Sequence, residues 1–133
     1  MNWKIIFQLS VFGLIMAFGT VSLIPQNVEP VFWVVIFVFC AFVIAKACSS
    51  KYFLHGLLTG LLNCVWITTV HVVFFKTYLL NHAQIDTAIT GLPPSFSIHP
   101  RLALALVGSI PGVLSAVVLG LFSFVASKIS KKK

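Results

Sequence analysis

The feature that most constrains this chain is the grouping of its apolar residues into four long, nearly uncharged blocks. Hydrophobic residues make up 59% of the 133 residues and charged residues only 8%, against about a quarter charged in an ordinary soluble domain. So few charges could not cover the core of a soluble fold, whereas blocks of about 18 or more apolar residues are typical of membrane-spanning helices. The sequence therefore predicts an all-α integral membrane protein without a separate soluble domain.

The block boundaries predict a single transmembrane domain over residues 1–133, with four helices in an antiparallel bundle. The segments PQNVEP and CSSK interrupt the first three blocks, so these connections are short. The apolar run of the first block continues past its candidate cleavage site, which indicates a retained helix and not a signal peptide. The expected segments are the spans 5–24, 31–47, 52–75 and 102–129, a loop over 76–101 that is irregular in its second half, and a basic tail at 130–133.

The basic residues predict the orientation of these helices. With four crossings, seven of the nine fall on one side: Lys4, Lys46, Lys51, Lys128, Lys131, Lys132 and Lys133. Lys76 and Arg101 fall on the other side with both acidic residues, Glu29 and Asp86. The positive-inside rule then places both termini in the cytoplasm and the 76–101 loop outside. The four tail lysines are expected to contact anionic lipid head groups.

The four-span layout with a lysine tail resembles that of many small bacterial inner-membrane proteins. The likeness is architectural, and it implies the bacterial inner membrane as the location. The net charge of +7 does not indicate nucleic acid binding, because no folded soluble surface is expected to present a groove reader.

Small residues recur at four-residue spacing on every expected span. In lipid, helices associate through close backbone approach, because apolar side chains gain little by leaving lipid for protein. The spacing predicts helix contacts, in a compact bundle or a dimer, at Gly13, Ala17, Ala41, Ala45, Gly56, Gly60, Gly108, Gly112, Ala116 and Gly120. Pro111 predicts a kink in the fourth helix, which either follows the shape of the bundle or forms a hinge beside a cavity.

The segment HGLLTGLLN at 55–63 adds polar residues to this pattern. His55, Thr59 and Asn63 lie within about 80° on a helix, and His71 lies further round. Their face should point into protein, because unpaired polar groups are costly in lipid. Two interpretations stay open: hydrogen bonds between helices, each worth about 0.5–2 kcal/mol, or the lining of a path for a solute or an ion.

Other chemistry has little support in the sequence. His82, Asp86 and His99 are weak candidates for a metal site, whereas Cys40, Cys48 and Cys64 fit small packing residues and form no C-x-x-C. No Asp, Glu or Arg lies inside the expected spans, which argues against carboxylate-coupled exchange and against clamping an anionic cosubstrate. Nucleophile turns, zinc motifs and phosphate loops are missing as well. We therefore expect no enzyme activity and no cofactor.

The sequence favours a scaffold, an accessory subunit or a self-associating helical bundle. Its expected partners are the lipid bilayer, including anionic lipids, and either further copies of itself or the other subunits of a membrane complex. The alternative is a passive channel or transporter for a small solute or ion, with a path lined by Asn63, Thr59 and His71.

Overall fold

The computed structural model describes residues 1–130, which form seven helices and no strand. Four of these helices are long and apolar enough to cross a membrane. This confirms the predicted all-helical fold class with four helices of membrane-spanning length and composition. The long helices are α1 Trp3–Ser22, α2 Glu29–Ala47, α3 Tyr52–Val73 and α7 Pro100–Ser130, and the short ones are α4 Phe75–Asn81, α5 Ala83–Thr90 and α6 Pro94–Ser97.

Prolines begin helices in this fold more often than they end them. Pro30, Pro94 and Pro100 each lie at the start of a helix, where the missing N–H needs no partner and the fixed φ suits the first turn. As a result α2 begins at Glu29, two residues before the predicted span 31–47. The 76–101 segment is likewise more helical than expected, and α7 continues as one helix through Pro111.

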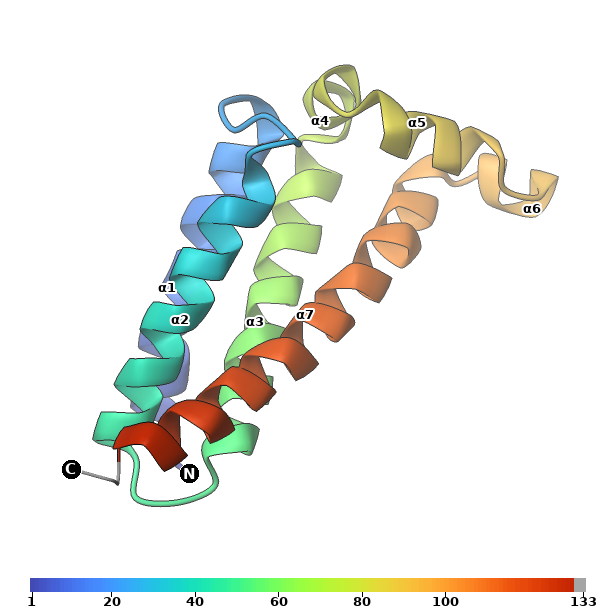
Figure 1. The fold of residues 1–133 in the computed structure, drawn as a ribbon. Helices are drawn as coiled ribbons and strands as arrows, with labels where there is room; N and C mark the ends of the chain where they lie inside the picture. The colour runs from blue at the N-terminus through green and yellow to red at the C-terminus, as the bar shows by residue number, and fades with distance from the viewer. Residues whose placement is uncertain (131–133) are drawn as a thin grey trace.

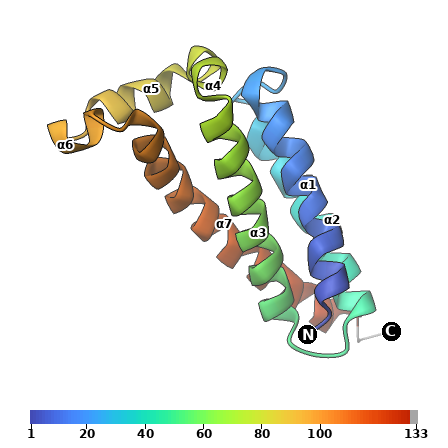
Figure 2. The same cartoon turned by 180° about the vertical axis from the view of Figure 1, so that it is seen from behind.

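The helices α1, α2, α3 and α7 run along one another, and α3 packs against both α1 and α7 (Figure 1). The N-terminus and the end of α7 lie at one end of the molecule, while α4, α5 and α6 lie at the other end, as the view from behind also shows (Figure 2). The helices α2 and α7 are close together near the termini and separate toward the end that carries α4 and α5. The ring contact of Phe37 with Phe122, 6.4 Å between centroids, lies on the part where they meet.

Small residues bring the backbones of α3 and α7 into contact. A Cβ on Gly60 would lie 2.8 Å from the Cβ of Ala116 and even closer to its Cα. A Cβ on Gly56 would lie 2.6 Å from the carbonyl oxygen of Leu119. Because only hydrogen atoms fit into these spaces, the two glycines fix how closely α7 approaches α3.

The other predicted small-residue positions lie mostly at contacts within the chain. Gly13 meets Asn63, Gly112 meets Cys64, and Gly120 meets Phe53. Three alanines continue this packing in buried clusters: Ala41 and Ala45 of α2 with α7, and Ala17 of α1 with α3. Gly108 is different, because a Cβ there would meet no atom of another helix within 4 Å among residues 1–130. Gly108 therefore makes no helix contact within residues 1–130, because α7 has separated from its neighbours at this level.

Two glycine-to-alanine variants distinguish a glycine at the α3–α7 contact from a glycine beside open space. Gly60→Ala is expected to lower the free energy of unfolding by about 1–3 kcal/mol, because the added methyl group forces α3 and α7 apart. Gly108→Ala is expected to be neutral or to stabilise the helix by up to about 1 kcal/mol, because its methyl group enters open space. Unfolding of the detergent-solubilised protein, followed by circular dichroism, measures both. Equal loss of stability in the two variants would contradict the assignment of the α3–α7 contact.

Candidate functional site

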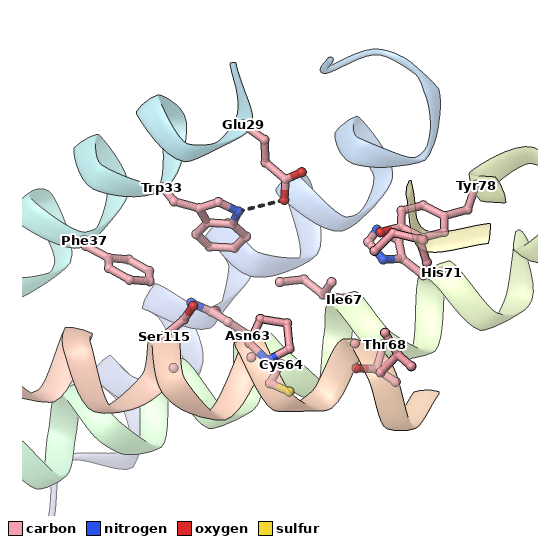
Figure 3. Close-up of a pocket in the computed structure, with 16 residues that line it drawn as sticks. Glu29, Trp33, Phe37, Asn63, Cys64, Ile67, Thr68, His71, Tyr78 and Ser115 are labelled. Carbon is pink, nitrogen blue, oxygen red and sulfur yellow. Dashed lines mark hydrogen bonds between the residues drawn. The ribbon is translucent and has the colours of Figure 1, made fainter. Parts of the chain in front are cut away.

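A cavity of about 400 Å³ lies between α2, α3 and α7, on the side where α2 and α7 separate (Figure 3). Its α2 wall carries Glu29, Trp33 and Phe37. The walls of α3 and α7, and the end formed by α4 and α5, contribute Gly60, Asn63, Cys64, Ile67, Thr68, His71, Tyr78, Ile85, Val107, Gly108, Pro111, Gly112 and Ser115. A concave site of this size, mostly apolar with a few polar groups, is typical of small-molecule binding.

The local sequence explains why space is left here. Gly108 and Gly112 place no side chains on the face of α7 that borders the cavity. Pro111 between them removes one backbone donor from the helix. The cavity therefore begins where the tight contact of α7 with α3 ends.

Asn63 is the least satisfied polar group of the cavity wall. Its side chain is 3% exposed, and neither its amide nitrogen nor its amide oxygen has a hydrogen-bond partner among the described residues. The amide packs against the bare backbone of Gly13 on α1. An unsatisfied buried amide costs about 1–3 kcal/mol. The interhelical hydrogen bond considered for Asn63 is therefore not made within residues 1–130, although its amide is enclosed between α3 and α1.

The two other polar residues of the segment 55–63 are satisfied and lie away from the cavity. The Nε2 of His55 accepts a hydrogen bond from the backbone N–H of Asn2 at 2.9 Å, and its Nδ1 donates to the carbonyl of Lys51, also at 2.9 Å. The hydroxyl of Thr59 is completely buried and donates to the carbonyl of its own turn at His55. Thr59 is not among the residues that line this cavity, whereas Asn63 and His71 are.

Three stacked rings stand at the α4 end of the cavity. Tyr78 lies between His71, at 3.9 Å between ring centroids, and His82, at 4.1 Å. The Thr20 hydroxyl donates to the carbonyl of Met16, so the Nε2–H of His71 donates to the Thr20 oxygen at 2.8 Å and joins α3 to α1. Burial, and then the negative charge of Glu29, raise the pKa of Tyr78 to about 12. The phenol therefore stays neutral at physiological pH.

The weak metal candidates are not brought together. His82 is buried in the ring stack, and its Nδ1–H donates to the carbonyl of Tyr78 at 2.9 Å. Asp86 and His99 are exposed. Within residues 1–130 no three His, Cys, Asp or Glu side chains are placed to share a metal ion. The four-residue spacing of His82 and Asp86 does not bring their side chains together, because the ring of His82, the N-cap of α5, turns back to the carbonyl of Tyr78.

Glu29 is the site residue that sequence reasoning missed. It is the first residue of α2, and its carboxylate accepts a hydrogen bond from the indole N–H of Trp33 at 3.1 Å (Figure 3). It therefore begins a helix that is long and apolar enough to cross a membrane, two residues before the predicted span 31–47. Two signals in the sequence could have revealed it: Pro30, which suits the first turn of a helix, and the four-residue spacing from Glu29 to Trp33.

The lysines expected to contact lipid are described only in part. Lys128 is exposed at the end of α7, with its ammonium 5.2 Å from the centroid of the Phe124 ring. Lys131, Lys132 and Lys133 lie outside the described residues.

A scan against protein-family models and searches of curated proteins and of solved structures found no match for this chain.

The native cysteines test whether the cavity is accessible. Cys64 lines it, whereas Cys40 is fully buried between helices. Two variants are compared, one that keeps only Cys64 and one that keeps only Cys40, with the other two cysteines of each replaced by alanine. Cys64 is expected to react with N-ethylmaleimide at least about tenfold faster than Cys40, because alkylation follows thiol exposure. Mass spectrometry of the protein in liposomes gives the rates. Ser50→Cys in a cysteine-free chain supplies an exposed reference, and a Cys64 as slow as Cys40 would contradict an accessible cavity.

Proposed function

We propose that this chain is a carrier that binds a small solute in the α2–α3–α7 cavity and moves it across a membrane. The observation that carries the proposal is Asn63, a buried amide that lines the cavity without a hydrogen-bond partner among the described residues. Polar side chains in membrane-spanning helices are costly and are most often used for a substrate or an ion. Such a carrier would act without catalytic chemistry and without a cofactor.

A carrier fits this geometry better than an open channel. From Asn63 toward the end with the N-terminus, the contacts of Gly60 with Ala116 and of Gly56 with Leu119 bring α3 and α7 together. Passage of a solute would therefore need α7 to move relative to α3. We propose Pro111 as the hinge of this movement, because proline weakens the helix there and Gly108 leaves room beside it.

The proposed orientation follows the basic residues. The four long helices form an antiparallel bundle in a bacterial inner membrane, with both termini in the cytoplasm and α4, α5 and α6 outside. In this orientation Lys128 and the tail lysines contact anionic lipids on the cytoplasmic side. The cavity then lies in the outer half of the membrane.

Self-association, the basis of the scaffold hypothesis, has weaker support. The small residues on which it relied pack within the chain, as Gly60 does with Ala116 and Gly112 with Cys64. A glycine face that another helix of the same chain covers is not free to meet a second copy.

Asn63→Leu tests the carrier proposal. Proteoliposomes are tested for uptake of radiolabelled urea, glycerol, acetamide, tetramethylammonium and benzylamine, and at least one is expected to enter faster than into protein-free liposomes. Leucine has a similar volume but cannot form a hydrogen bond, so that uptake should fall about tenfold or more. Asn63→Ala should reduce it as well, and circular dichroism checks that both variants fold.

A matched control removes a polar group from the outer face of the same helix. Thr69 is exposed, and its hydroxyl only donates to the carbonyl of Val65. Thr69→Val should therefore leave uptake unchanged. No uptake of any of the five solutes, or equal uptake by Asn63→Leu and the unmodified chain, would remove the carrier proposal.

A further inference from the structure

We infer that the solute bound in this cavity is an organic cation, a protonated or quaternary amine with an apolar body. The inference rests on the proposed function, because it names the class of solute for the same cavity. It comes from the charge, the aromatic faces and the apolar surface around that cavity.

The charge of the cavity is negative and uncompensated. Glu29 and Asp86 are the only acidic residues of the chain, and only Glu29 lines the cavity. Its carboxylate has the Trp33 indole as a hydrogen-bond donor but no ion pair within residues 1–130. The N-terminal dipole of α2 favours a carboxylate at this position, and a cation beside it would add an ion pair. A cationic solute would supply this missing partner.

The basic residues at the same end of the molecule leave the cavity negative. Lys76 and Arg101 line a separate pocket, together with His99. Of the two histidines near the cavity, His71 donates its Nε2–H to Thr20 and His82 is stacked behind Tyr78. An anionic solute would therefore meet the charge of Glu29 with no basic side chain of the cavity wall to offset it.

The aromatic residues beside Glu29 suit a cation as well. Trp33 lies on the same wall, with Phe37 next to it at 5.6 Å between ring centroids. The face of an indole ring attracts an ammonium group by about 0.5–2 kcal/mol, and this attraction is largest where water is excluded. Tyr78 offers no such face, because His71 and His82 cover its two sides. The ammonium position is therefore expected beside the Glu29 carboxylate and over the face of the Trp33 indole, whose N–H edge is already bonded to Glu29.

The rest of the cavity suits an organic body and not a bare metal ion. Ile67, Val107 and Pro111 form apolar surface, and Asn63 offers one hydrogen-bonding group. Calcium and magnesium ions need about six or more oxygen ligands, whereas Glu29 is the only carboxylate on this wall. An apolar amine fills both the charged and the apolar part.

Protection of Cys64 from N-ethylmaleimide tests the inference, because Cys64 lines the cavity. The full chain with Cys40→Ala and Cys48→Ala is placed in phosphatidylcholine liposomes. The two probes are benzyltrimethylammonium and neopentylbenzene, its uncharged isostere in which carbon replaces nitrogen. The cation should protect Cys64 at a concentration about tenfold lower than the isostere does. Glu29→Gln should abolish this difference and leave protection by neopentylbenzene unchanged.

Asp86→Asn is the matched control, since it removes the same charge from an exposed position on α5 outside the cavity. It should leave protection by the cation unchanged. Equal protection by the two probes in the unmodified chain, equal effects of Glu29→Gln and Asp86→Asn, or protection by sodium chloride at the concentration of the organic cation would overturn the inference.

The two proposals fail in different ways. If uptake of urea, glycerol or acetamide depends on Asn63 while benzyltrimethylammonium gives no preferential protection, the cation inference is wrong and the carrier proposal stands. If no solute is taken up in an Asn63-dependent way, the carrier proposal itself is wrong.

Discussion

The contact between the backbones of α3 and α7 is the constraint on which the rest of this structure depends. Gly56 and Gly60 on one helix, facing Leu119 and Ala116 on the other, allow an approach that any larger side chain would prevent. In a membrane, such contacts replace the hydrophobic effect as the force that holds helices together, because lipid solvates an apolar side chain as well as protein does. The position of α7 relative to the other helices follows from this pair.

The cavity is a consequence of the same contact. Close packing of the C-terminal part of α7 fixes the direction of this helix. Toward its N-terminal end α7 separates from α2 (Figure 1), and the ring contact of Phe37 with Phe122 belongs to the part where the two helices still meet. Along that stretch Gly108 carries no side chain and meets no atom of another helix within 4 Å among residues 1–130, so it leaves open space at the edge of a cavity of about 400 Å³. One kind of residue thus has two effects, because glycine closes an interface where a helix faces it and opens a cavity where none does.

The polar residues of α3 divide according to this geometry. His55 and His71 each bond to α1 or the residue before it, and Thr59 bonds to its own turn. Only Asn63, which lies where the packed part of α3 gives way to the cavity, has no partner among the described residues. Glu29 faces the same cavity from α2 with a single indole donor. Asn63 and Glu29 therefore line the same cavity, which supports a binding site there, while the other buried nitrogen without a partner among the described residues, Nε2 of His82, lies in the ring stack with Tyr78.

The sequence by itself determined the four membrane-spanning helices and most of the packing positions, because length, low charge and four-residue spacing are local properties of the chain. It also identified Asn63 as the residue to explain. Only the tertiary structure decided that Gly108 borders open space, that Thr59 lies outside the cavity, and that Glu29 and Trp33 line the same cavity as Asn63. The physical reason is that these relations depend on the angle at which α7 leaves α3. That angle is set by close contacts between residues about 55 positions apart in the chain, and no local pattern encodes it.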